Sequence, residues 1–273
     1  MGDPSNGVEE LPGGWVLPGL VDAHVHLAFD MSGLGLRRAS RDLVLANLAL
    51  HRRAGVLLVR DVGAPPGVRL KGPHVISAGR FLAPAGGYTE GIYDPVPSDG
   101  LEDAALAELA AAGDGWVKVV ADYPEGQLSS PAPLNYDLPV LAAAVDAVHA
   151  AGGRVAAHTT GAAAPTVVAA GVDSVEHGLG LDEDSVRALA ARGGAWTPTL
   201  TSSLTLLEAE GASADHLREL IPLAHRLGVA ILAGTDLTPA GSLAREVARL
   251  FEFGLAPVAA LAAASTAARA YLG

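Results

Sequence analysis

Short runs of β-branched and aliphatic residues recur along this chain, separated by alanine- and leucine-rich segments, and this alternation restricts the possible folds most strongly. Eight runs have the length and composition of buried strands: 20–27, 55–63, 73–79, 116–122, 153–160, 173–179, 194–201 and 229–236. Between them, helical periodicity is clearest in residues 137–151, 182–192, 213–227 and 242–254. Eight strand–helix units in one chain of 273 residues predict an α/β fold of the (β/α)8 TIM-barrel type.

The main alternative to a barrel is an open, doubly wound sheet. That fold commonly carries a glycine-rich phosphate-binding motif after one of its strands. Neither a G-x-G-x-x-G pattern nor a P-loop follows any of the eight runs, and no change of composition marks an interdomain linker. We therefore expect residues 1–20 to form a lead-in segment and residues 21–273 to form one barrel domain.

The composition excludes several classes of partner. The formal net charge of −12 disfavours nucleic acids and anionic membrane surfaces. The chain has no cysteine, so disulfides and zinc–thiolate sites are excluded. Residues 1–14 are polar and acidic and lack the apolar centre of a signal peptide, and the uncharged stretch 253–268 is too short to span a bilayer. These features predict a soluble, cytoplasmic protein with no membrane partner.

Residues that can bind metal ions fall near the ends of several expected strands. His24 and His26 are two positions apart on the first strand, so their side chains leave the same face. In a barrel, side chains at the C-terminal ends of the strands converge on one mouth. Six residues would meet there: His24, His26, Lys118, His158, His177 and Asp236.

Each of these residues also has a structural explanation when it is considered alone. A His-x-His pair can arise by chance among nine histidines, Asp236 could cap the helix that follows it, and Lys118 could extend to the surface. Several such coincidences would have to occur together at corresponding strand ends, which favours a metal site. The remaining histidines are assigned structural roles, because four lie in helical segments and one opens a strand: His51, His149, His216, His225 and His74.

The lysine in the fourth expected strand is unusual, because the chain has only two lysines, Lys71 and Lys118, among 18 basic residues. Burial and nearby metal ions both disfavour an ammonium group and lower its pKa. A neutral amine can add carbon dioxide and become a carbamate, an anionic ligand with two oxygen atoms. Arginine cannot do this, because it stays protonated. A carbamate, four imidazoles and an aspartate make a chemically sensible site for two divalent ions about 3.5–4 Å apart.

The same positions carry motifs that resemble the amidohydrolase superfamily, and within it the binuclear branch with prolidase-like and imidazolonepropionase-like members. The motifs are VLPGLVDAHVHL, VRDVG, VKVVAD, AAHTTG, SVEHG and LAGTD at the first, second, fourth, fifth, sixth and eighth expected strands, and ASTAARAYLG at the end. They cover almost the whole chain. The resemblance implies that His24, His26 and Asp236 hold the more buried metal ion. It also implies that His158 and His177 hold the more exposed one, with carboxylated Lys118 bridging both.

The resemblance further implies zinc as the metal, with manganese, cobalt or nickel as substitutes, and hydrolysis by a metal-bridging hydroxide. Asp236 would accept the proton of the hydroxide and pass it to the leaving group. We expect an enzyme that hydrolyses an amide bond in a small molecule: a dipeptide, an N-acyl amino acid or a cyclic amide. The alternatives are an esterase, lactonase or phosphotriesterase using the same site, and a catalytically silent barrel that serves as a binding or assembly module.

One departure from such relatives concerns a second domain. They usually carry a small β-sandwich built from both flanks of the barrel, whereas here only about twenty residues precede the first expected strand and none follow AYLG. The expected fold is therefore a barrel that lacks most or all of the sandwich. The barrel surfaces that the sandwich would cover could instead be buried in a homo-oligomer.

The long segments after the third and fourth expected strands would border the active site. Their glycine and proline content is typical of loops that cover a site. Their tyrosines could line an apolar pocket or pack the loops against the barrel, and their arginine could bind a substrate carboxylate or form a surface salt bridge. The candidate substrate-binding residues are Arg80, Tyr88, Tyr93, Tyr123 and Tyr136.

Overall fold

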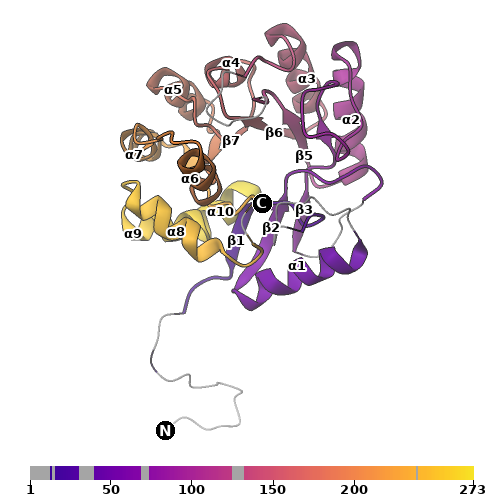
Figure 1. Ribbon diagram of the computed structural model, residues 1–273. Helices are drawn as coiled ribbons and strands as arrows, with labels where there is room; N and C mark the ends of the chain where they lie inside the picture. Colours follow the sequence, from indigo (N-terminus) through magenta and orange to yellow (C-terminus); the bar gives the residue numbers. More distant parts are fainter. Residues whose placement is uncertain (1–12, 14–15, 31–39, 69–73, 125–131, 238) are drawn as a thin grey trace.

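The computed structural model describes residues 13, 16–30, 40–68, 74–124, 132–237 and 239–273. Parallel strands form a ring in these residues, and helices surround the ring on its outside (Figure 1). Most of the expected lead-in segment, residues 1–12, 14 and 15, lies outside the described residues.

The strands of the ring fall into two hydrogen-bonded sheets, and every neighbouring pair is parallel. The first sheet contains, in order, β1 (Leu20–Val25), β2 (Val56–Asp61) and β3 (Val75–Ser77). The second contains, in order, β4 (Phe81–Leu82), β5 (Trp116–Val120), β6 (Arg154–Thr159), β7 (Ser174–His177), β8 (Ala195–Thr197) and β9 (Ala230–Ile231).

Backbone hydrogen bonds join the two sheets into a closed cylinder. On one side, the N–H of Lys118 donates to the carbonyl of Ala78, at 3.1 Å. On the other side, the N–H of Ala23 donates to the carbonyl of Ala233 at 2.9 Å, and the N–H of Asp236 donates to the carbonyl of His24 at 2.8 Å. These bonds link β1 to the chain that follows β9. The expected (β/α)8 barrel is confirmed, with β3 and β4 together forming its third strand.

Two expected strands have different limits in the structure. The third continues beyond residue 79 into β4, with a break at Gly79, where φ is 76° and an added Cβ would lie 2.6 Å from a carboxylate oxygen of Glu108. The expected strand 194–201 was too long. It ends at Thr197 because Pro198 has no N–H for a strand ladder, and a helix begins at Leu200.

The helices are α1 (Arg41–Arg53), α2 (Leu101–Ala112), α3 (Leu138–Ala150), α4 (Ala164–Ala169), α5 (Glu183–Ala191), α6 (Leu200–Ala209), α7 (Leu217–Leu227), α8 (Leu243–Glu252), α9 (Pro257–Ala263) and α10 (Thr266–Leu272), with a short 3-10 turn, η2 (Ser98–Gly100), before α2. The four expected helices correspond to α3, α5, α7 and α8. Helix α7 begins later than expected, because Ser213 accepts a hydrogen bond from the N–H of Asp215 in a turn instead. Among the described residues, no helix has the length and apolar character needed to cross a membrane.

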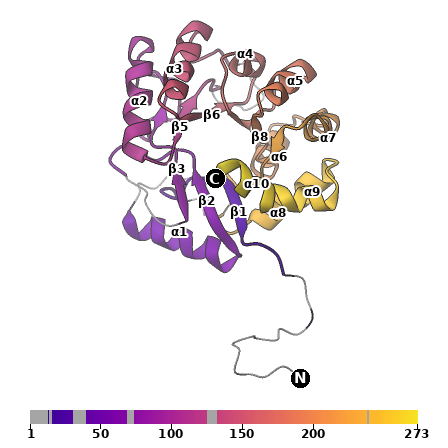
Figure 2. The same ribbon diagram turned by 180° about the vertical axis from the view of Figure 1, so that it is seen from behind.

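The C-terminal helix closes one end of the barrel. Arg154, the first residue of β6, donates hydrogen bonds to the carbonyls of Tyr271 at 2.6 Å and Leu272 at 3.0 Å. The C-terminus accordingly lies near the middle of the ring from both sides (Figures 1 and 2). Since α10 covers the N-terminal ends of the strands, the opposite end is the one available for a site.

Candidate metal centre

The six residues expected at the barrel mouth come together at the C-terminal ends of the strands. All six are buried: His24, His26, Lys118, His158, His177 and Asp236. The ring centroids of His24 and His177 are 5.0 Å apart, and those of His158 and His177 are 4.5 Å apart. The structure therefore joins residues from β1, β5, β6, β7 and the segment after β9 into one cluster.

The tightest part of the cluster has the geometry of a metal-binding site. The Nε2 atoms of His24 and His26 each lie 3.3 Å from the same carboxylate oxygen, Oδ1 of Asp236. Their ligand atoms all lie within 4.8 Å of one another. Two imidazoles and a carboxylate at this separation can hold one divalent ion.

Several nitrogen atoms of the cluster lack the partners that buried polar atoms normally have. Nε2 of His24, Nε2 of His158 and Nζ of Lys118 are buried and make no hydrogen bond within the part of the chain that the structure describes. Leaving such atoms unpartnered is costly unless another group satisfies them. Burial lowers the pKa of His177 to about 3 and lowers the pKa of His158 well below its usual value, so both rings are neutral, the form that binds metal ions.

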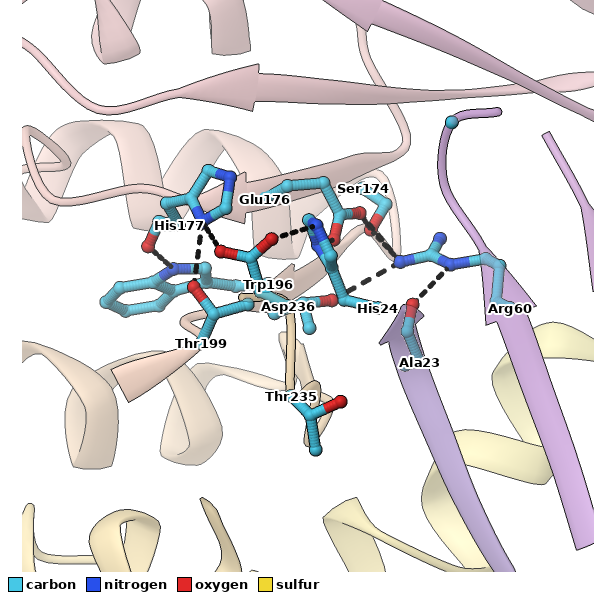
Figure 3. Close-up of polar contacts among 12 residues, drawn as sticks. Ala23, His24, Arg60, Ser174, Glu176, His177, Trp196, Thr199, Thr235 and Asp236 are labelled. Atoms are coloured by element: carbon cyan, nitrogen blue, oxygen red, sulfur yellow. Dashed lines mark hydrogen bonds and ion pairs between the residues drawn. The ribbon is translucent and has the colours of Figure 1, made fainter. Parts of the chain in front are cut away.

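The carboxylate of Glu176 sets the orientation of His24. Its Oε2 lies 2.7 Å from Nδ1 of His24, which donates the hydrogen bond and so leaves Nε2 as the free lone pair (Figure 3). Burial, the largest single effect, raises the pKa of Glu176, but the opposing effects of Arg60, His24 and Lys118 together exceed it and move that pKa well below its usual value. Glu176 therefore stays ionised and fixes His24 in the tautomer that suits a metal ligand.

A buried arginine below the cluster compensates the charge of Glu176. Nη2 of Arg60 lies 2.7 Å from Oε1 of Glu176, and Nε donates to the carbonyl of Ala23 at 2.8 Å (Figure 3). Ser174 donates to the same carboxylate oxygen at 2.6 Å. Neither Arg60 nor Glu176 was among the candidate site residues. The available sequence signal was a charged residue within an apolar motif in each case: Arg60 in VRDVG and Glu176 in SVEHG.

Lys118 is enclosed by this charged layer. Burial lowers the pKa of Lys118 to about 8, although the carboxylates of Glu176 and Asp236 oppose the effect. A fraction of neutral amine is therefore present near neutral pH, which distinguishes Lys118 from an ordinary exposed lysine. Lys118 lies on an apolar strand because its side chain is buried inside the barrel and does not extend to the surface.

His177 reaches the cluster through an unusual backbone conformation. Glu176 and His177 are adjacent on β7, and strand geometry would send their side chains to opposite faces. His177 has a φ of 68°, which breaks the alternation and allows both residues to face the same region. Asp236, with a φ of 50°, departs from extended geometry in the same way.

Almost the whole chain matches a known protein family. Residues 15–273 match the model of the amidohydrolase family. The chain belongs to the amidohydrolase family. This amidohydrolase is 38% identical over 283 residues to the uncharacterised protein Mb2939c of Mycobacterium bovis, with 96% of the chain and 75% of that protein covered. The uncharacterised protein Rv2915c of Mycobacterium tuberculosis matches to the same extent.

Solved structures show the same fold. A Xaa-Pro dipeptidase with bound methionine has a TM-score of 0.75 and 23% identity, covering 94% of the amidohydrolase and 75% of the dipeptidase. A putative prolidase from Bifidobacterium longum has a TM-score of 0.72 and 25% identity, covering 94% of the amidohydrolase and 69% of the prolidase. The ochratoxinase of A. niger has a TM-score of 0.72 and 21% identity, covering 93% of the amidohydrolase and 71% of the ochratoxinase. The resemblance to amidohydrolases seen in the sequence is confirmed.

Two of the candidate tyrosines of the amidohydrolase lie beside the cluster of six candidate metal-binding residues. The ring centroids of Tyr88 and His158 are 5.8 Å apart, and those of Tyr123 and His158 are 6.4 Å apart. Phe81 continues this aromatic surface, with its ring 5.0 Å from Tyr88 and 5.3 Å from His26. We define the three residues Phe81, Tyr88 and Tyr123 as the aromatic wall.

The other candidates for substrate binding have partners away from the cluster. The hydroxyls of Tyr93 and Tyr136 donate to the carbonyls of Pro84 and Val96, both at 2.9 Å. Nε of Arg80 lies 2.6 Å from the carboxylate of Glu108 on α2, outside the barrel. The structure does not bring these three residues into the cluster, and their role in substrate binding stays a prediction.

Three further buried aspartates, which sequence reasoning did not select, hold the strand ends in place. Asp22 accepts hydrogen bonds from the N–H and hydroxyl of Thr235, next to Asp236. Asp61 accepts one from the N–H of Leu27, next to His26. Asp122 accepts two from Thr160, close to His158. Each aspartate thus fixes the backbone beside a residue of the cluster.

The histidines assigned structural roles lie outside the cluster. His149 pairs with Asp173 at 2.8 Å, and His216 lies 2.8 Å from the carbonyl of Leu179. His51 is buried on α1, 3.8 Å from Asp22, and it borders a cavity of about 270 Å³ that also touches His26 and Asp236.

Proposed function

We propose that this amidohydrolase is a metal-dependent hydrolase that cleaves an amide bond in a small-molecule substrate. The observation that carries the proposal is the set of buried nitrogen atoms around Asp236 that have no hydrogen-bond partner among the described residues. A barrel that only bound partners would bear the cost of these atoms without benefit, whereas bound cations would satisfy them. Membership of the amidohydrolase family supports a hydrolytic enzyme.

The donor set suits two divalent ions. His24, His26 and Asp236 would hold one ion, and His158 and His177 would hold the second. Lys118 would bridge them after its neutral amine adds carbon dioxide: a bond forms between Nζ and the carbon, one N–H proton is released, and a carbamate anion results. Nitrogen and oxygen ligands of this kind are compatible with zinc and also with manganese, cobalt or nickel.

When bound, the ions would act as Lewis acids and would lower the pKa of water. The chain itself would move the proton. Burial raises the pKa of Asp236, but the combined effects of His24, His26 and His177 lower it well below its usual value. Asp236 therefore stays ionised and able to accept a proton. Asp236 would take a proton from the attacking water and deliver it to the nitrogen of the breaking C–N bond. The products would be a carboxylate and an amine.

The aromatic wall supports an apolar group on the substrate, next to His158. Tyr88 is distinct within it, because its hydroxyl makes no hydrogen bond within the described residues, whereas the hydroxyl of Tyr123 pairs with Thr89 at 2.9 Å. Burial raises the pKa of Tyr88 above its usual value, so its hydroxyl stays protonated. We assign Tyr88 the role of donating a hydrogen bond to the substrate carbonyl.

A hydrolysis screen of the metal-loaded full chain tests the proposal. The panel contains dipeptides, N-acyl amino acids, cyclic amides, lactones and aryl phosphotriesters, and the metal content of the same sample is measured. We expect two ions per chain and the highest kcat/KM on an amide. The matched control is Asp236→Asn, which should retain much of the metal but lose roughly 10²–10⁴-fold in kcat, the usual value of a positioned acid–base group. Faster turnover of lactones or phosphotriesters would replace the amide proposal, and no turnover of any substrate by the two-ion protein would favour a silent binding module.

A further inference from the structure

The first turn of α6 directly contacts two residues of the candidate metal-binding cluster, His177 and Asp236. The chain enters this helix from β8 through Pro198 and Thr199. Thr199 has φ 45° and ψ 46°, a left-handed conformation that a β-branched residue seldom adopts. Only three non-glycine residues in the described part of the chain have a positive φ, and the other two are His177 and Asp236.

The unusual conformation places the hydroxyl of Thr199 against His177. Oγ1 of Thr199 lies 2.7 Å from Nδ1 of His177 (Figure 3). The same oxygen lies 3.2 Å from Oγ of Ser203. Thr199 is fully buried. If the threonine hydroxyl donates to Ser203, it accepts from Nδ1–H of His177, and Nε2 of the ring is then left as a lone pair.

The same turn also contacts Asp236. The hydroxyl of Ser202 donates to Oδ2 of Asp236 at 3.0 Å. The two oxygens of Asp236 thus have different neighbours: Oδ1 faces His24 and His26, whereas Oδ2 faces α6 and also lies 4.0 Å from Nδ1 of His177. Thr199 and Ser202 together orient one proposed metal ligand and the proposed proton carrier.

A buried carboxyl group from α8 holds this turn in place. Glu246 is fully buried and accepts hydrogen bonds from the N–H of Leu200 at 2.7 Å and from the N–H and hydroxyl of Thr201, both at 2.8 Å. Helix α6 has no capping bond from its own N-cap side chain, so Glu246 satisfies N–H groups that would otherwise be unpaired. The two residues that directly follow the strained Thr199 are therefore both anchored, which makes its conformation sustainable.

We infer that the first turn of α6 is a positioning element in which the strained Thr199 fixes the tautomer of His177 and Ser202 fixes Asp236. The inference rests on the proposed function in that His177 is taken as a metal ligand. A glycine at position 199 would adopt the same φ without strain. Threonine is the costlier residue for this backbone, and what it adds is the hydroxyl on His177. Thr199 acts through His177 and is a positioning residue.

Three substitutions at one position separate the hydroxyl from the backbone. Thr199→Ser retains the hydroxyl, Thr199→Val retains the shape without the hydroxyl, and Thr199→Gly removes both the hydroxyl and the strain. Urea unfolding of each metal-free protein shows that it folds. The tautomer of His177 is read from nitrogen-15 NMR of histidine-labelled full-length protein, with the signal assigned by comparison with His177→Asn.

We expect Nδ1–H with an unprotonated Nε2 in the parent and in the serine variant, and a mixture of tautomers in the valine and glycine variants. Calorimetric titration with zinc should show one of two ions bound about 10–100-fold more weakly by the valine and glycine variants, and near-parental affinity for serine. An Nε2–H tautomer in the parent would overturn the inference. So would a valine variant that keeps both the parental tautomer and the parental affinity.

The tautomer does not depend on metal, so the two proposals can fail separately. If the parent takes up no zinc while the four proteins show the expected tautomers, the positioning role of Thr199 is supported and the metal-dependent function is refuted.

Discussion

Replacing Glu176 with glutamine would remove the negative charge that lies below the cluster of six candidate metal-binding residues. Glu176 accepts hydrogen bonds from His24, Arg60 and Ser174, at 2.7, 2.7 and 2.6 Å. Glutamine has nearly the same shape but offers one oxygen and one NH2 group. Its NH2 group must face a donor on His24 or Arg60, and Arg60 loses its only carboxylate partner in the described residues.

The size of the effect follows from the burial of the pair. Both side chains are fully buried, so the charge of Arg60 would be left without compensation in the barrel interior. Removing one partner of a buried ion pair costs about 3–5 kcal/mol. Glutamine keeps the volume and some hydrogen bonds, which places the expected loss near 3 kcal/mol. Because a folded domain has only about 5–15 kcal/mol of stability, this loss is large.

Urea unfolding of the metal-free protein, followed by circular dichroism, measures the loss. With a slope of about 3 kcal/mol per M, the midpoint of Glu176→Gln should fall by about 1 M. The matched control is the double variant Arg60→Met, Glu176→Met, which removes both charges and should recover part of the loss. A single variant with a shift below about 0.3 M, or a double variant less stable than the single one, would refute the buried-pair reasoning.

The acid limb of the stability curve gives an independent check. The pKa of Glu176 lies below its ordinary value of 4.5, so its contribution to stability is present above that pH and is lost progressively as the pH falls from there towards the lower pKa of the folded state. The parent should therefore lose stability on acidification more steeply than Glu176→Gln. Parallel curves below pH 4.5 would mean that the carboxylate is not stabilised by folding.

Two other substitutions test the lysine and a second buried acidic side chain. Lys118→Ala should bind fewer than two zinc ions by calorimetry and should lose activity that added formate or acetate partly restores; full activity without them would contradict a bridging role. Burial raises the pKa of Glu246 to about 7 from an ordinary 4.5, so between these pH values the native state keeps a proton that the unfolded chain has lost. The free energy of unfolding therefore falls as the pH rises from 4.5 to 7, by about 3 kcal/mol in total. Glu246→Gln should flatten this part of the urea-midpoint curve between pH 5 and 7.5, and an unchanged slope would show that Glu246 is ionised throughout.

The parts of the fold and site that the sequence predicted are those governed by simple periodicity. Apolar runs located every barrel strand, and the period of two along the first run placed His24 and His26 on one face. Strand limits were less accurate where one residue changes the backbone, as Pro198 does after β8. The six metal-type residues were predictable together because a closed barrel gathers the ends of all strands at one mouth.

The supporting contacts were not predictable, because they depend on pairs that only the closed barrel brings together. Arg60 and Glu176 are 116 positions apart and meet only across its interior. Glu246 and Leu200 meet through the packing of α8 against the start of α6. Neither pair has a local sequence pattern, whereas the motifs that carry the six candidate metal-binding residues have one.

Backbone irregularity explains why the rest of the site escaped periodic reasoning. A regular β7 would direct either Glu176 or His177 inward, but not both. The positive φ of His177 allows the strand to supply a metal-type residue and the carboxylate that orients His24 from adjacent positions. Such a conformation is tolerated because the neighbours of His177 are bonded on both sides: its carbonyl accepts from Trp196 at 2.8 Å and its ring contacts Thr199. The rigidity of the barrel thus stabilises the local departures from regular geometry that build the site.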